Sequence, residues 1–284
     1  MKGVLGKPAH RLKAGEKMNR VLPGIALALC WLLLLLKGSS WLFAAVLLPA
    51  LAIGAYEYGR MALTENSFKQ SVLLALLSVL PLIFQIFYPQ LGLDDGFVLG
   101  FMFLAFWTLS TYREGFDSYG FLARGTFGLV WVGFMGAHLY LIRCLPEGNA
   151  WLLILTGITA GSDSGAYYVG RAFGKRKLSS LISPKKTVEG AAGGIVTGVF
   201  VAALLAFLLL DSVPWLFVVL TAIVLGAIGI CGDLTESVIK RATGTKDSGT
   251  ILGGHGGILD RADSMLFAAP VLYYLLLIFF SLGS

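Results

Sequence analysis

The chain has 284 residues, of which 57% are hydrophobic and only 13% charged, and its formal net charge is +6 at pH 7. A soluble domain carries about 25% charged residues. Together with a mean hydropathy of +0.80, this composition excludes a soluble protein and leaves no room for a separate soluble domain. We therefore predict an all-α, polytopic membrane protein, in which the many glycines allow helices to approach closely.

The predicted elements begin after a basic, polar stretch at residues 1–17, which is either a native tail or a leader and is excluded from fold reasoning. A membrane-spanning helix needs about 20 mostly apolar residues. Short or polar runs leave eight or ten spans open, but the preferred count is nine. The runs lie near residues 20–36, 41–58, 70–88, 96–112, 125–142, 149–170, 188–210, 214–236 and 264–282. We divide the rest of the chain into N-terminal helices at 18–142 and a C-terminal catalytic region at 143–284.

The distribution of basic residues predicts the orientation. With nine spans, every Lys and Arg except Lys37 and Arg143 lies on the side of the N-terminus. Lys and Arg are enriched in cytoplasmic loops, so this side is expected to be cytoplasmic and the C-terminus external. A wrong number of helices would distribute the Lys and Arg residues over both sides of the membrane. The one-sided distribution therefore supports a count of nine. We expect a multi-pass protein of the cell (inner) membrane with its active site on the cytoplasmic side.

Acidic residues interrupt the apolar runs of the C-terminal region. Asp163 falls inside the sixth run, where a carboxylate is costly unless it is paired, hydrated or protonated. Asp233 and Glu236 end the eighth run, and Asp260 and Asp263 begin the ninth. Spacing of i and i+3 places both members of a pair on one helix face, so both pairs are expected to face one cavity. Such carboxylates suit a hard divalent cation such as Mg²⁺.

Two of these acidic residues also have a structural alternative. Asp163 could make a capping or interhelical hydrogen bond with its serine neighbours, and Asp263 could cap the ninth helix. For a single aspartate the structural alternative is favoured, whereas for the whole set the functional one is.

Basic residues on the same side predict an anionic ligand. They could instead be positive-inside anchors or contacts to anionic headgroups. A GGHGG loop at residues 253–257 leaves backbone N–H groups free for phosphate oxygens, while the absence of GxxxxGK[ST] excludes a P-loop enzyme. A nucleotide or polyphosphate site is therefore predicted. The basic residues are Lys185, Lys186, Lys240, Arg241 and Lys246.

At these residues the chain resembles the phosphatidate cytidylyltransferases, also called CDP-diacylglycerol synthases. The family signature corresponds here to Ser237, Lys240-Arg241, Lys246-Asp247, His255-Gly256-Gly257, Asp260-Arg261 and Asp263. A second block of resemblance runs from Asp163 to Gly190, with departures at Ser164 and Val188. The two blocks cover roughly the C-terminal 120 residues, and the N-terminal half resembles the family only in being apolar.

The resemblance implies transfer of CMP from CTP to phosphatidic acid, giving CDP-diacylglycerol and pyrophosphate. It implies Mg²⁺ held by Asp233, Asp260 and Asp263, with Lys240 and Arg241 as further catalytic groups. A second cation is a further expectation. Nucleic acid is not expected as a partner. The residues expected to bind substrate are Lys185, Lys186, Lys246, Asp247, His255, Arg261 and Asp163.

Two other functions and one assembly question stay open at this point. A related enzyme that uses another lipid phosphate would keep the same metal and triphosphate groups. A transporter is disfavoured, because the polar residues crowd at one membrane face and no inverted repeat is visible. Small residues at Gly190, Gly194 and Gly198 could pack helices within one subunit or between the two subunits of a homodimer.

Overall fold

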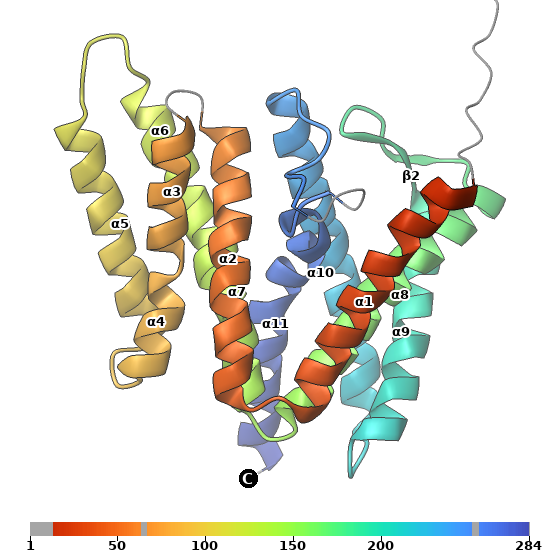
Figure 1. The fold of residues 1–284 in the computed structure, drawn as a ribbon. Helices are drawn as coiled ribbons and strands as arrows, with labels where there is room; N and C mark the ends of the chain where they lie inside the picture. Colours follow the sequence, from red (N-terminus) through yellow and green to blue (C-terminus); the bar gives the residue numbers. More distant parts are fainter. Residues whose placement is uncertain (1–13, 64–66, 252–255, 284) are drawn as a thin grey trace, which may run out of the picture.

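The computed structural model describes residues 14–63, 67–251 and 256–283 of the chain. Figure 1 shows helices that run up and down through one bundle, with α1 lying across α8. Each of the nine expected apolar runs lies in a helix or in a broken helix. The elements are α1 (Ala14–Lys37), α2 (Ser40–Ala62), α3 (Ser67–Ser78), α4 (Leu80–Phe87), α5 (Gly92–Ser110), α6 (Ser118–Gly128), the π-helical η1 (Leu129–Phe134), α7 (Met135–Cys144), α8 (Gly148–Phe173), β1 (Lys177–Ser179), β2 (Ser183–Thr187), α9 (Val188–Leu209), α10 (Trp215–Ala242) and α11 (Leu259–Gly283).

Within the described ranges, 7 helical segments are long and apolar enough to cross a membrane, and this confirms a polytopic helical bundle. The two expected spans outside this set are α1 and α8. The apolar part of α1, Gly24–Lys37, is shorter than the others. The 26-residue α8 is about 39 Å long, which exceeds the roughly 30 Å hydrocarbon core, but its second half is polar. Residues 1–13 of the predicted tail lie outside the described residues, while its last residues belong to α1.

Two of the predicted spans differ in detail from a single regular helix. The 70–88 run divides into α3 and α4 at Val79, because Pro81 has no N–H to continue the helical hydrogen bonds. The 125–142 run begins earlier, at Ser118, where the Asp117 carboxylate accepts the N–H of Gly120 at 2.8 Å and caps the helix. This span then passes through η1 before it ends in α7.

The tightest helix pair is α8 with α9, and glycines make it possible. A Cβ on Gly194 would lie 2.7 Å from the carbonyl oxygen of Ser162, and one on Gly190 would lie 2.8 Å from that of Ala166. Such approach needs small residues on the facing sides. The glycine face of α9 is therefore occupied within the subunit, and a homodimer stays a prediction that this face does not support.

A short antiparallel hairpin, absent from the predicted all-α architecture, connects α8 to α9. Its strands β1 and β2 pair Lys177 with Thr187 and Ser179 with Ser183. The hairpin lies at the end of the bundle where α10 also ends (Figure 1). At this end α2 also ends, α3 begins and the α5–α6 connection lies, whereas the α1–α2, α7–α8 and α9–α10 connections lie at the opposite end. The predicted two-sided arrangement of the loops is thus present.

Candidate active site

Two side chains at the junction of β2 and α9 hold the base of the hairpin. Thr187 caps α9 by accepting the N–H of Gly190 on its hydroxyl oxygen at 3.1 Å. One carboxylate oxygen of Glu189 accepts the backbone N–H groups of Lys175 and Arg176 at 3.0 and 3.1 Å. The other accepts the Arg176 guanidinium at 3.2 Å. The hairpin is therefore fixed against the end of α8. This fixes the position of Lys185 and Lys186 on β2.

A cavity of about 350 Å³ lies beside the hairpin, between α8, β2, α9, α10 and α11. Much of its lining is apolar or small. Its charged lining residues come from three elements: Asp163 and Arg171 from α8, Lys185 and Lys186 from β2, and Asp233 from α10. The structure therefore brings together predicted site residues from separate segments. It also adds Arg171, which the sequence analysis did not select although it follows a glycine within the second block.

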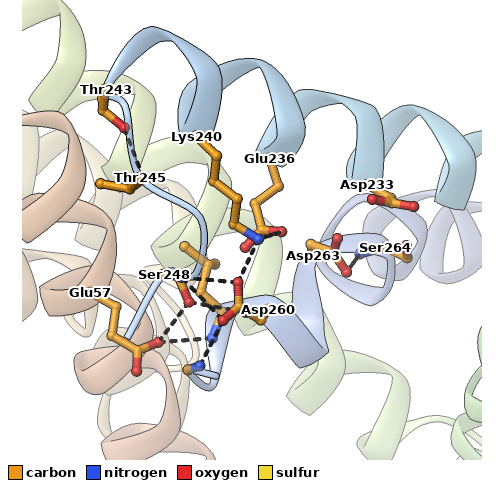
Figure 2. Close-up of polar contacts among 12 residues, drawn as sticks. Glu57, Asp233, Glu236, Lys240, Thr243, Thr245, Ser248, Asp260, Asp263 and Ser264 are labelled. Carbon is orange, nitrogen blue, oxygen red and sulfur yellow. Dashed lines mark hydrogen bonds and ion pairs between the residues drawn. The ribbon is translucent and has the colours of Figure 1, made fainter. Parts of the chain in front are cut away.

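Two carboxylates line this cavity, Asp163 from α8 and Asp233 from α10, whereas Asp263 of α11 does not line it. Asp233 forms an ion pair with Lys186. Figure 2 shows Asp233 and Asp263 on the neighbouring helices α10 and α11. The helices can approach here because a Cβ on Gly232 would lie 2.7 Å from the Asp263 carbonyl oxygen. Concentrated negative charge beside a lysine suits a site for a cation and phosphates together.

A second group of charges lies deeper in the protein, and we call it the buried network. The Lys240 ammonium is 2.5 Å from a carboxylate oxygen of Glu236 and 2.5 Å from one of Asp260 (Figure 2). Asp260 also accepts the backbone N–H of Gly257 at 2.7 Å and that of Ser248 at 3.0 Å. The network consists of Glu57, Glu236, Lys240, Ser248 and Asp260.

This arrangement corrects the expectation that each i, i+3 pair faces one cavity. Glu236 is 3% exposed and turns to Lys240, whereas Asp233 lines the cavity. Asp260 turns to Lys240 and to backbone N–H groups, while Asp263 lies near Asp233. An α-helix rotates by about 100° per residue, so side chains at i and i+3 point in directions that differ by about 60°. Where two helices cross, this difference is enough for the two carboxylates of one pair to have different neighbours. The roles of Asp260 and Lys240 in metal or substrate binding stay predictions.

Glu57 of α2 was missed by the sequence analysis. It is 3% exposed, and its carboxylate accepts the N–H of Leu259 at 3.0 Å and the hydroxyl of Ser248 at 3.4 Å. The available signal was a glutamate inside the second apolar run, since an ionisable residue within a membrane span is a functional candidate. The acidic residues predicted from the sequence all belong to the C-terminal region, although the same rule applies to α2.

None of the remaining predicted residues that the structure describes lines the cavity. The Arg241 guanidinium donates to the carbonyl oxygen of Ile182 at the hairpin at 3.3 Å. Lys246 and Asp247 are exposed in the segment after α10, and Arg261 is exposed at the start of α11. His255 lies outside the described residues.

The described residues hold a suitable donor chemistry for Mg²⁺ but not a complete cage. Within them, no three His, Cys, Asp or Glu side chains are grouped closely enough to hold a metal by themselves. Mg²⁺ commonly uses one or two carboxylates and takes its other oxygens from water and substrate phosphates. Asp233 and Asp263, which lie on the neighbouring helices α10 and α11 (Figure 2), fit that smaller requirement.

Comparison with protein families gives a match to the model described as "Cytidylyltransferase family" over residues 18–279. The chain belongs to this family. The match includes α2 and the other N-terminal helices, so the family relationship extends well beyond the two C-terminal blocks that carried the resemblance. Glu57 and the cavity residues therefore all lie within the residues that match the family model.

Individual relatives are similar over nearly their whole length. The phosphatidate cytidylyltransferase of Bacillus subtilis is 35% identical over 272 residues, which cover 93% of this chain and 99% of the relative. That of Staphylococcus epidermidis is 38% identical over 268 residues, covering 91% and 98%. That of Pseudomonas aeruginosa is 37% identical over 254 residues, covering 85% and 89%.

Proposed function

We propose that this chain is a phosphatidate cytidylyltransferase, which transfers CMP from CTP to phosphatidic acid and releases pyrophosphate. The observation that carries the proposal is the cavity, where carboxylates and lysines from separate segments meet at one end of a membrane bundle. Its apolar and small lining residues suit the attached lipid, and its charges suit phosphates. The names of the relatives agree with this reaction. Family membership also disfavours the transporter alternative.

The basic residues of the cavity are proposed to bind the triphosphate. Lys185, Lys186 and Arg171 line it from two elements, so they can contact phosphate oxygens from more than one side. Their positive charge reduces the repulsion between two anionic substrates, and a positioned charge of this kind stabilises developing negative charge in a transition state. Lys240, Arg241, Lys246 and Arg261 remain proposed contributors from the adjacent end of α10 and α11.

The chemical step needs no nucleophile from the protein, because the lipid phosphate is already anionic. One of its oxygens forms a bond to the α-phosphorus of CTP, and the bond from that phosphorus to the oxygen bridging the β-phosphate breaks. Pyrophosphate leaves with the electron pair. Mg²⁺, when bound by Asp233, Asp260 and Asp263, would neutralise charge on the phosphate oxygens. Asp163, Asp247 and His255 are proposed to position a second cation, the ribose or pyrophosphate.

The location of the site suits one lipid and one water-soluble substrate. The cavity lies beside the hairpin, at the end of the bundle that carries most basic loops (Figure 1). The positive-inside rule makes this end cytoplasmic, where CTP is available, while the lipid stays in the leaflet. We propose a protein of the inner membrane that takes phosphatidic acid from the cytoplasmic leaflet.

The decisive experiment uses the purified, detergent-solubilised protein with CTP, phosphatidic acid and Mg²⁺, each omitted in turn. CDP-diacylglycerol and pyrophosphate should form in equal amounts in the complete mixture alone. Chelation of divalent cations should stop product formation and leave the melting temperature nearly unchanged, since Glu236 and Asp260 already have Lys240 as an ion-pair partner without a metal. No product in the complete mixture would refute the proposed activity.

A related activity with another lipid phosphate is the alternative that keeps the same cavity charges. Polyprenyl or ether-lipid phosphates offered in competition with phosphatidic acid separate the two activities. Preference for phosphatidic acid supports the proposal, and preference for a competing lipid would replace the substrate but not the reaction type.

A further inference from the structure

Glu57 connects the N-terminal helices to the last helix through a single carboxylate. It lies on α2, whereas its partners Ser248 and Leu259 lie just before and at the start of α11, 191 and 202 residues away in the chain. We propose that Glu57 is a positioning residue: its carboxylate holds this segment so that Asp260 and Lys240 keep their places beside the cavity. The kinetic part of this inference depends on the proposed function, whereas the structural part does not.

The contact occurs where the backbone approaches the carboxylate too closely for a side chain. A Cβ on Gly257 would collide with the Glu57 carboxylate and the Ser248 hydroxyl, and a Cβ on Gly249 would collide with the same carboxylate. The Leu259 N–H that Glu57 accepts is at the N-terminus of α11. Negative charge is favourable at that end of a helix. Glu57 therefore replaces a local N-cap with one supplied by α2.

Ser248 passes the effect of Glu57 to Asp260. Its hydroxyl donates to Glu57 at 3.4 Å, and its backbone N–H donates to both carboxylate oxygens of Asp260 at 3.0 and 3.1 Å. The N–H of Asp260 in turn donates to the Ser248 hydroxyl oxygen at 3.3 Å. Asp260 then pairs with Lys240, which also pairs with Glu236. Figure 2 shows this connected path from Glu57 to Glu236.

The chemistry of a carboxylate explains why glutamine should not substitute for Glu57. Both groups that point at it, the Leu259 N–H and the Ser248 O–H, are donors. A glutamine has the same size but carries one acceptor oxygen and one NH₂ donor. Both donors reach the same carboxylate oxygen of Glu57, so the glutamine oxygen could keep these hydrogen bonds. The new NH₂ would then replace the other carboxylate oxygen, which is buried without a hydrogen-bond partner among the described residues, and an unpaired buried donor is costly. Glu57→Gln should therefore loosen the segment without creating a cavity.

The first test measures amide hydrogen exchange of Glu57→Gln in the full-length protein, with Glu147→Gln as the matched control. Glu147 also joins distant parts of the chain, because its carboxylate accepts the N–H of Asp211 at 3.1 Å. It belongs to the α7–α8 connection, which lies at the opposite end of the bundle (Figure 1). Glu57→Gln should speed exchange in peptides from 245–251 and 256–262 and leave α5 and α9 unchanged. Glu147→Gln should leave both of those peptides unchanged.

The second test separates positioning from general stability by kinetics. Loss of a group that orients a site residue typically lowers activity about 10- to 100-fold, so kcat of Glu57→Gln should fall within this range. The KM for CTP should change less than kcat, because Glu57 lies outside the cavity lining. Ser248→Ala should lower kcat in the same direction. The double variant should be no worse than Glu57→Gln alone, since both act through one path.

Three results would overturn the inference. One is unchanged exchange at 245–251 and 256–262 in folded Glu57→Gln. Another is faster exchange throughout the protein, which would make Glu57 a general stabiliser. The third is additive effects of Glu57→Gln and Ser248→Ala on kcat. If Glu57→Gln does not fold, Ser248→Ala alone must show the local exchange effect. A wild-type protein without cytidylyl transfer would refute the proposed function, and the exchange experiment would still decide whether Glu57 holds the segment.

Discussion

The cavity and the buried network contain the same residue types but differ in exposure. In the cavity the Lys186 and Asp233 side chains are 28% and 31% exposed. In the network Lys240, Glu236 and Asp260 are 16%, 4% and 9% exposed. Ion pairs that solvent reaches can exchange partners at little cost, whereas removing one member of a buried pair leaves an uncompensated charge. The cavity residues are thus suited to bind substrates, and the network residues to hold the helices that carry them.

The largest effect should come from neutralising one of the carboxylates that are proposed to bind Mg²⁺. Asp233→Asn and Asp263→Asn should each lower kcat at least about 100-fold, because each removes a negative charge that a cation would bind. Both proteins should fold, since neither residue pairs with Lys240 in the structure and an asparagine oxygen can still accept the Ser264 N–H as Asp263 does. Product formation and melting temperature measure the two effects. Asp211→Asn, in the α9–α10 loop, is the control, and full activity in either test variant would remove that residue from the metal site.

The next effect should be on stability and should separate the network from the cavity. Lys240→Met leaves Glu236 and Asp260 without their shared cation, and breaking such a buried group costs about 3–5 kcal/mol. The free energy of unfolding in mixed micelles measures this loss. Adding Glu236→Gln should recover part of it, because one buried charge then disappears. Lys69→Met, at an exposed position of α3, should change the stability little. A Lys240→Met protein as stable as wild type would show that the network is not needed for folding.

A smaller effect, on substrate binding, is expected at the hairpin. Lys186→Ala should raise the KM for CTP roughly tenfold, the effect of losing one charge-assisted hydrogen bond, with a smaller change in the melting temperature. Lys177→Ala is the control, since Lys177 belongs to the same hairpin but does not line the cavity. If Lys186→Ala left the KM for CTP and the KM for phosphatidic acid at their wild-type values, Lys186 would lie outside the substrate site.

The smallest effect is expected at Arg241, whose exposed side chain contacts the hairpin through the carbonyl oxygen of Ile182. Removal of an exposed contact changes stability by about 0.5 kcal/mol or less, so Arg241→Ala should alter the melting temperature only slightly. Because Arg241 does not line the cavity, the substitution should raise the KM for CTP less than Lys186→Ala does. A fall in kcat comparable to that of Asp263→Asn would contradict this and would support the catalytic role that the family resemblance implies for Arg241.

The sequence alone determined the class of protein, the positions of the apolar runs and the separation of basic loops onto one end. These are local properties, since hydropathy and charge can be counted along the chain. The motif residues between Asp163 and Asp263 were also recognisable, because their chemistry does not depend on where they pack. The division between α3 and α4 at Val79 could have been predicted from Pro81. The hairpin could not, because it depends on the contact between the Glu189 carboxylate on α9 and the backbone N–H of Lys175, which precedes β1.

Only the tertiary structure decided which charges meet. The i, i+3 spacing placed Asp233 with Glu236 and Asp260 with Asp263, but the crossing of α10 and α11 instead set Asp233 near Asp263 and joined Glu236 to Asp260 through Lys240. The contact of Glu57 with Ser248 spans 191 residues. No local pattern encodes such a partner, because it depends on how every intervening helix packs.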